Sequence, residues 1–335
     1  MNVLVDTNIW LKERLLRSHL GAAFVFALRQ AGARLIYPQS LHEEIEARLA
    51  KDVQKTLSEL EAHRRFLLTV TGELSGFVMP KVDAAAALRR RVAELAPIMH
   101  QVHHSAAELE RALVRVTQHV APAHRTEEFR DALLWEVALR VAGGPSLLLV
   151  TADAAFYVEG KSDGVLHQDL RADASACGVN VRAVRSIEDA PKLLGRSASF
   201  PAKRLEEALI AGFAPRIVDA VANWSVAPPN DWIVHVDAFL TEQLGRLALS
   251  FDMRGPTSLV TLAPSTELVA AEPFATGTAT YDSDSGSLSD IQPELIGLRS
   301  PEGEKLRAHA FAYVRGTSKT ERFTLRHPLS LDRSV

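Results

Sequence analysis

The fold is decided by a short stretch near the start of the chain, Val3-Leu4-Val5-Asp6-Thr7-Asn8. An apolar run ends there abruptly in an acid and two polar residues. A second apolar run, at residues 147–150, is followed in the same way by Thr151-Ala152-Asp153. Short apolar runs bounded by polar residues are typical of strands buried in a parallel sheet. Each run therefore predicts a strand with an aspartate just past its carboxyl end.

Around these two runs, the first 195 residues alternate short apolar strands with helical patterns. The predicted strands lie at residues 2–6, 34–37, 147–151 and 180–184. Helices between parallel strands give right-handed crossovers, which build an open sheet. The predicted fold class is α/β, with a mainly parallel sheet flanked by helices in a domain at residues 1–195.

Capping signals mark three helix starts. Ser40 is followed three residues later by Glu43, and Ser105 by Glu108, which is the capping-box spacing. Thr126 precedes two acids, which suit the positive end of a helix dipole. The composition between the first and last of these starts predicts a helical insertion at about residues 50–125, clearest at 84–96 and 105–120.

After residue 195 the pattern changes to short strands separated by turn residues. A linker at 196–201 precedes an amphipathic helix at 204–223, for which Pro215 predicts a break. Alternating apolar residues predict half-buried strands at 247–253 and 306–314, and residues 282–287 predict a turn. A smaller β-rich α+β domain is expected at 203–335. Four of its aromatic residues are expected to serve its core rather than a binding surface: Trp224, Trp232, Phe274 and Tyr281.

Composition excludes several classes of protein. The chain has 335 residues, and its 38 Lys and Arg against 41 Asp and Glu exclude nucleic-acid binding by the whole surface. One cysteine, Cys177, excludes a disulfide scaffold and a four-cysteine zinc site. No apolar run approaches the roughly 20 residues that span a bilayer, and the first residues lack a signal-peptide pattern. We therefore expect a cytoplasmic protein that does not associate with membranes.

Four acids are expected to meet at one edge of the predicted sheet. Asp6 and Asp153 follow strands, Glu44 lies one turn into the helix after Pro38, and Asp131 lies early in the helix that begins near Thr126. Crowded carboxylates raise one another's pKa, and a divalent cation relieves the repulsion. Oxygen ligands favour Mg²⁺ or Mn²⁺, and one or two such ions suit phosphodiester hydrolysis.

At these residues the chain resembles the PIN domain family of metal-dependent nucleases. The matching segments are Val5-Asp6-Thr7-Asn8, Pro38 to Glu44-Ile45, Phe129-Arg130-Asp131-Ala132, and Val150-Thr151-Ala152-Asp153 followed by Phe156. With Leu166-His167-Gln168-Asp169-Leu170, the third segment is similar to a bacterial subgroup of PIN-like proteins that has an enlarged helical insert and a C-terminal extension. The resemblance covers about residues 1–190.

The resemblance implies a function and a set of site residues. It implies a central parallel sheet, a Mg²⁺ or Mn²⁺ site and cleavage of single-stranded RNA. The implied metal-binding and catalytic acids are Asp6, Glu44, Asp131 and Asp153. Asn8 and Thr151 are expected to hydrogen-bond around these acids, and Arg130, His167 and Asp169 are candidate substrate contacts. The insertion is longer than in compact toxin-type PIN domains, so the resemblance does not imply that this protein is a toxin with an antitoxin partner.

Other interpretations stay open at this stage. The same site could serve a nuclease that acts on DNA, for example in defence, or the fold could bind RNA or protein without cutting. The C-terminal domain could bind a protein partner or a second copy of the chain. Seven arginines of the insertion could steer a phosphate backbone, although a solvated helix face is the better interpretation: Arg64, Arg65, Arg89, Arg90, Arg91, Arg111 and Arg115.

Overall fold

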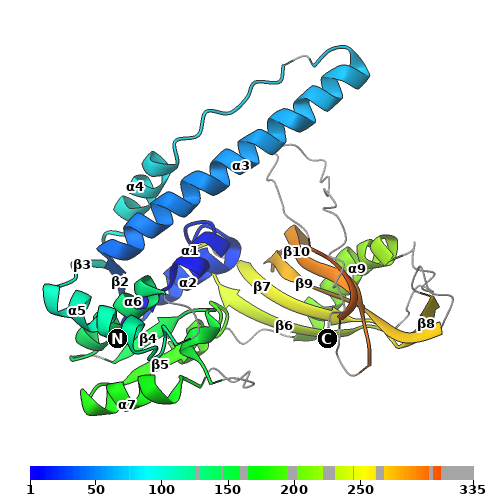
Figure 1. Cartoon of the computed structure of the whole chain (residues 1–335). Helices are drawn as coiled ribbons and strands as arrows, with labels where there is room; N and C mark the ends of the chain where they lie inside the picture. The colour runs from blue at the N-terminus through cyan, green and yellow to red at the C-terminus, as the bar shows by residue number, and fades with distance from the viewer. Residues whose placement is uncertain are drawn as a thin grey trace. The chain divides into compact units, whose positions relative to one another are not determined.

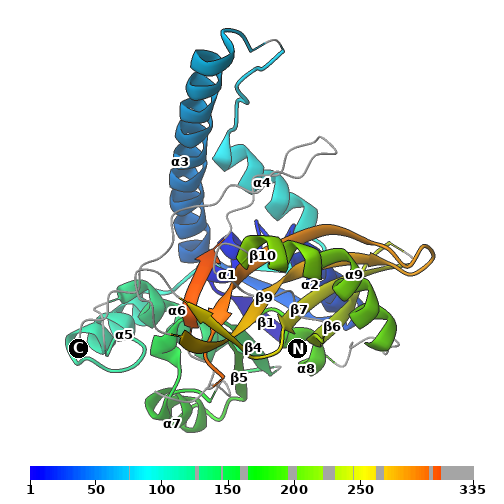
Figure 2. The same ribbon diagram turned by 90° about the vertical axis from the view of Figure 1, so that its right-hand side faces the viewer.

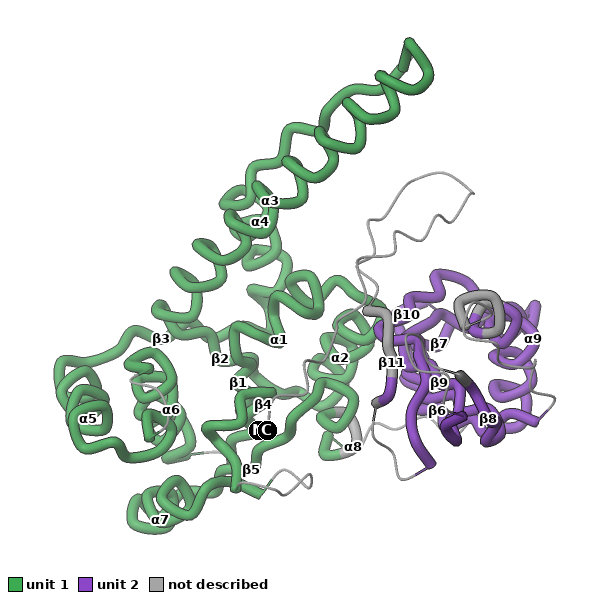
Figure 3. Tube along the Cα trace, turned by 45° about the vertical axis from the view of Figure 1, so that its right-hand side comes forward, with its two compact units in different colours: residues 1–195 green, residues 196–335 purple. Residues whose placement is uncertain are grey.

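Two sheets organise the chain in the computed structural model (Figure 1). The structure describes residues 1–335 except 75, 125–127, 145, 159–164, 195–201, 222–230, 244, 262–267, 302–304 and 311–335. The chain divides into two units, Met1–Gly195 and Arg196–Val335, which Figure 3 colours separately. The division lies at the end of the range predicted for the first domain.

The sheet of the first unit is parallel throughout its described strands. These are β1 (Asn2–Val5), β2 (Arg34–Pro38), β3 (Met99–Val102), β4 (Leu147–Val150) and β5 (Val181–Val184). Their order is β3-β2-β1-β4-β5, and each neighbouring pair is parallel. The predicted α/β class and the four predicted strands are confirmed. The strand β3 was not predicted.

The order of the strands creates a switch point between β1 and β4. The chain builds β2 and β3 on one side of β1 and then crosses to β4 and β5 on the other side. Ligands of open α/β sheets bind beyond the carboxyl ends of the strands at such a point. Val5 pairs with Val150 in this register. Asp6 and Thr151, the next residue of each strand, therefore leave the sheet at the same level.

Both faces of the sheet are covered, which explains why its central strands are apolar runs. Leu4 and Leu149 belong to a buried cluster with Trp135. Neighbouring residues of a strand point to opposite faces, and Val3 and Val5 are buried as well. The central strands have no solvated face, so their sequences are continuous apolar runs and do not alternate between apolar and polar residues.

The helices of the first unit connect and cover these strands. They are α1 (Thr7–Lys12), α2 (His19–Gln30), α3 (Gln39–Thr71), α4 (Ala84–Leu95), α5 (Ala106–Thr117), α6 (Phe129–Val141), the 3₁₀ turn η1 (Ala154–Phe156), α7 (Gln168–Ala176) and α8 (Ala190–Leu193). Among the described residues, no helix is both long and apolar enough to cross a membrane.

One predicted capping box is confirmed and another is wrong. The backbone N–H of Glu108 donates to Ser105 Oγ, and the Ser105 N–H donates to Glu108 Oε2 at 2.6 Å. By contrast, α3 begins directly after Pro38, so Ser40 lies inside the helix. Glu43 instead accepts from Gln39 Nε2 at 2.9 Å. The third predicted start, Thr126, lies outside the described residues.

The predicted insertion is mostly helical, but it also contains β3. This strand pairs with β2 at the edge of the sheet, and two of its four residues are exposed. Its short, half-polar sequence lacks the apolar run that marks the central strands. The larger part of the insertion is α3, whose 33 residues extend about 50 Å. Figures 1 and 2 both show α3 running away from the five-stranded sheet.

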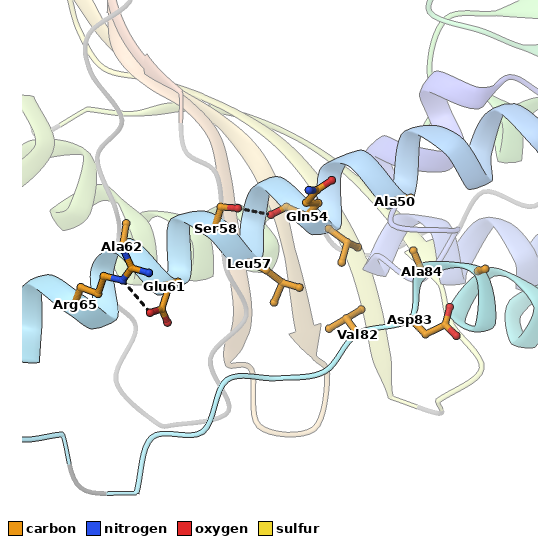
Figure 4. Close-up of a pocket in the computed structure, with 12 residues that line it drawn as sticks. Ala50, Gln54, Leu57, Ser58, Glu61, Ala62, Arg65, Val82, Asp83 and Ala84 are labelled. Carbon is orange, nitrogen blue, oxygen red and sulfur yellow. Dashed lines mark hydrogen bonds and ion pairs between the residues drawn. The ribbon is translucent and has the colours of Figure 1, made fainter.

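The chain returns from the end of α3 along one side of this helix. An open groove separates the two, and its lining includes Val53 and Leu57 of α3 and Val82 of the returning segment (Figure 4). Along the same helix, Glu61 accepts from Arg64 and Arg65. Val53 and Leu57 of α3 therefore face the returning segment. Arg64 and Arg65 are paired with an acid of their own helix.

The second unit is an antiparallel sheet with one long helix. Its elements are α9 (Ala202–Val221), β6 (Ile233–Leu240), β7 (Arg246–Arg254), β8 (Ser258–Thr261), β9 (Leu268–Asp282), β10 (Leu288–Arg299) and β11 (Lys305–Ala310). The order is β11-β10-β9-β7-β6, and β8 pairs with β9. The predicted helix and the strand at 247–253 are confirmed, and the strand predicted at 306–314 is described as far as Ala310.

The predicted helix break at Pro215 is wrong, because α9 continues through this residue. Phe213 and Ile217 on either side of it are fully buried against the sheet. Tertiary packing therefore outweighs the loss of one backbone hydrogen bond.

The aromatic residues and the turn of this unit follow the sequence predictions. Phe274 and Tyr281 are buried, and Trp232 packs against the core, as expected of core aromatics. Trp224 lies outside the described residues. In the predicted turn, Asp282 Oδ1 accepts from the N–H groups of two following residues.

A buried arginine of the insertion holds the loop between α1 and α2. Residues Arg14, Leu15 and Leu16 have φ values of 51°, 59° and 57°, a left-handed conformation that side chains rarely adopt. Arg91 Nε donates to the Leu15 carbonyl at 2.8 Å, and its Nη2 donates to the Leu16 carbonyl at 2.5 Å. Arg91 therefore has a structural role and is not part of a solvated basic face.

We predict that Arg91→Leu destabilises the first unit by about 2–3 kcal/mol, or roughly 5–10 °C in Tm. The substitution leaves the carbonyls of a strained loop without their charged donor. Thermal unfolding measures the effect. Arg90→Leu, at the exposed neighbouring position, is the control and should change Tm little. Equal losses in both variants would contradict this role for Arg91.

Candidate active site

Asp6 is positioned by the sheet and held by two side chains. Its N–H donates to the Val150 carbonyl at 2.9 Å, which continues the pairing of β1 with β4. Thr151 Oγ1 donates to Asp6 Oδ2 at 2.8 Å, and Asn8 Nδ2 donates to the same oxygen at 3.4 Å. Asp6 occupies the N-cap position of α1 but makes no side-chain capping bond there. Helix capping therefore does not account for this buried acid.

Thr151 connects Asp6 to Asp153. While its hydroxyl donates to Asp6, it accepts from the Asp153 N–H at 3.1 Å. The Thr151 carbonyl accepts from the Tyr157 hydroxyl at 2.7 Å, and Thr151 is fully buried. Asp153 Oδ1 accepts from the Ala155 N–H at 2.8 Å. One carboxylate oxygen of Asp153 thus has a local capping role.

The other two acids come from two helices that are far apart in the sequence. Glu44 lies in the second turn of α3, and Asp131 lies in the first turn of α6. Asp6, Glu44 and Asp131 line one small pocket, with Ser40, Leu41, Arg130 and Leu134. Asp153 is not among the lining residues, although its charge reaches both Asp6 and Asp131. Three predicted acids therefore share a pocket and the fourth lies within electrostatic reach.

Arginines neutralise part of this acidic pocket. Arg48 Nη1 donates to Asn8 Oδ1 at 2.8 Å and to Glu44 Oε1 at 3.3 Å. Arg130 Nη1 lies 3.9 Å from the same Glu44 oxygen. The sequence analysis missed Arg48, although its position one turn after Glu44 on a predicted helix indicates an ion pair. Arg48 therefore connects Glu44 of α3 to Asn8 of α1.

The crowding of the acids changes their proton affinities. Burial raises the pKa of Asp6, and the charges of Glu44 and Asp153 add to this effect, against the hydrogen bond from Thr151. Burial also raises the pKa of Asp131 to about 8, with further contributions from Asp153, Asp6, Glu128 and Glu44. Without a cation, Asp131 therefore remains largely protonated at neutral pH.

The donor chemistry of the pocket suits a hard divalent cation, but the side chains are not gathered into a finished metal cage. Among the described residues, no three His, Cys, Asp or Glu side chains form a group that could hold a metal ion as they stand. The available donors are carboxylate oxygens, which Mg²⁺ and Mn²⁺ prefer. Asp6, Glu44 and Asp131, which line the pocket, and Asp153 beside them are the residues that would hold such a cation.

The predicted substrate contacts differ in their positions. Arg130 lines the pocket. His167 and Asp169 instead interact at the start of α7, where the Asp169 N–H donates to His167 Nδ1 at 3.3 Å. The His167 ring also lies 4.7 Å from the ring of His124. These contacts give His167 a helix-capping role, so only Arg130 is placed beside the acids.

Two arginines of the insertion that were considered for phosphate steering are used inside the unit. Arg111 and Arg115 both donate to Glu136, at 2.5 and 2.6 Å. Arg115 also donates to Asp173 at 2.6 Å. These ion pairs join α5 to α6 and α7, so both arginines have structural roles.

Comparison with known proteins gives no family: no family model matches the chain, and no curated protein has a significantly similar sequence.

Asp131→Asn should stabilise the metal-free protein at alkaline pH. In the folded protein the pKa of Asp131 is raised from 3.8 to about 8, so the folded state keeps a proton that the unfolded state has already lost between these pH values. The contribution of Asp131 to the free energy of unfolding is therefore largest below pH 3.8. That contribution is lost as the pH rises to 8. In EDTA at pH 8 we expect Tm to rise by about 3–6 °C, with a smaller gain at pH 5. Glu110→Gln, at an exposed acid of α5, is the control, and a lower Tm for Asp131→Asn at pH 8 would contradict the prediction.

Proposed function

We propose that the first unit is a PIN-like, Mg²⁺- or Mn²⁺-dependent endoribonuclease that cleaves single-stranded RNA in the cytoplasm. The observation that carries this proposal is the meeting of acids from three separate elements, Asp6, Glu44 and Asp131, in one pocket at the switch point of a parallel sheet. Asp153 adds a fourth acid, whose charge acts on both Asp6 and Asp131. Proteins use such oxygen-only sites for hard cations that act on phosphates.

Each side chain has a distinct task in this proposal. When bound, one or two divalent cations would supply Lewis acidity and lower the pKa of bound water. Asp6, held by Thr151 and Asn8, provides a fixed carboxylate. Glu44 and Asp131 bring carboxylates from two helices, and Arg130 can contact a substrate phosphate from the rim. No side-chain nucleophile is needed.

A second candidate function is binding of RNA or protein without cleavage. It is favoured by Arg48, which contacts Glu44 and Asn8 and so occupies groups that a cation site would use. A DNA-directed nuclease of the same fold would use the same acids. The substrate assay below separates these functions.

The first test is cleavage of a labelled single-stranded RNA and of the same sequence as DNA, with Mg²⁺, Mn²⁺ or EDTA. We expect metal-dependent RNA cleavage that Asp6→Asn lowers by about 100-fold or more, because the buried carboxylate is lost while the size is kept. Preferential cleavage of DNA would select the alternative nuclease. Full activity of Asp6→Asn would contradict the proposed mechanism.

Glu44 and Glu43 form a matched pair within one helical turn. Glu44→Gln should abolish cleavage with the fold intact, since Glu44 lines the pocket. Glu43→Gln should leave the rate unchanged, because Glu43 is exposed and bonded to Gln39. Initial rates and circular dichroism of both variants check this. Equal loss of activity in the two would overturn the role of Glu44.

A further inference from the structure

The helix that carries Glu44 also extends far beyond the site. Glu44 lies near the start of α3, and Arg48 contacts both Glu44 and Asn8. Arg48 therefore fixes which face of α3 is turned toward the acids. Residues three and four positions apart share a helix face, so Lys51 and Lys55 continue this face beyond Arg48, away from the sheet.

Lys51 and Lys55 differ from the three arginines of α3. Both are exposed, and neither makes an ion pair or hydrogen bond in the described part of the chain. Arg48 is paired with Glu44, and Arg64 and Arg65 are paired with Glu61. The two lysines are thus available cations in line with the acidic pocket.

The opposite face of α3 is used for packing. Val53 and Leu57 line the groove toward the returning segment, as Figure 4 shows for Leu57 and Val82. At 100° per residue, Lys51 and Lys55 lie roughly opposite Val53 on the helix. The face of Arg48, Lys51 and Lys55, which we term the basic track, is consequently turned away from this groove.

We propose that the basic track holds the phosphates of a single polynucleotide strand on its way into the acidic pocket, an inference that rests on the proposed nuclease function. The side chains at successive track positions are about 5–6 Å apart, a spacing that lets neighbouring lysines bind different phosphates. The chain has a net charge of −3, so it needs a local cationic surface to attract a polyanion. Asp52, four positions after Arg48 and three before Lys55, shares this face and offsets one of its three positive charges.

The test is binding of a fluorescent 15-nucleotide single-stranded RNA in EDTA, where no cleavage interferes, over a range of KCl concentrations. For the double variant Lys51→Gln, Lys55→Gln we expect about tenfold weaker binding at low salt. The slope of log K against log salt should fall by about 1.4, because each single-strand phosphate contact contributes about 0.7. With metal, the variant should raise KM and leave kcat unchanged.

A matched control removes the same charge elsewhere in the unit. Arg89 and Arg90 are exposed residues of α4, and Arg89→Gln, Arg90→Gln should keep the wild-type slope. An unchanged slope in the lysine variant, equal losses in both variants, or no RNA binding by the wild type would overturn the track. If the wild type cleaves RNA while the lysine variant binds normally, the track fails and the nuclease stands. If the track binds RNA that is never cleaved, the nuclease fails instead.

Discussion

The pairing of β1 with β4 is the constraint on which the rest of the first unit depends. Because Val5 lies opposite Val150, the next residues, Asp6 and Thr151, meet at a distance that allows a direct hydrogen bond. A shift by one residue would turn Asp6 to the other face of the sheet and break this bond. The strand order then places helices α3 and α6 where Glu44 and Asp131 line the same pocket. The site is therefore a consequence of strand register.

Much of this arrangement could be predicted from local sequence. Central strands such as β1 and β4 are buried on both faces, so their apolar runs stand out, and the acids that end them are visible at once. The Ser105 and Glu108 capping box also depends only on neighbouring residues. The positions of Glu44 and Asp131 followed from the start of each helix and from strands that share one edge.

The missed features depend on contacts between distant residues. Nothing local to β3 indicates a strand, since pairing with β2 supplies its stability. Pro215 lies within α9 because the sheet packs against both sides of that position. The sequence around Arg91 indicates a surface charge, because its carbonyl acceptors lie in the left-handed loop at Leu15 and Leu16, about 75 residues earlier in the chain. In each case tertiary packing outweighs a local preference. Contacts between distant residues cannot be predicted from the local pattern of a single sequence.

The charges around the pocket follow from one electrostatic requirement: a phosphate cannot approach uncompensated carboxylates. Arg48 and Arg130 lie 3.3 and 3.9 Å from Glu44 Oε1 and partly compensate its charge. Among the described residues no arginine pairs with Asp131, whose pKa is raised to about 8 by burial and by neighbouring acids, so a proton compensates it instead. A divalent cation would have to displace this proton, so binding would strengthen as the pH rises. The pocket therefore combines arginine side chains near Glu44 with a proton on Asp131 that a cation would have to displace.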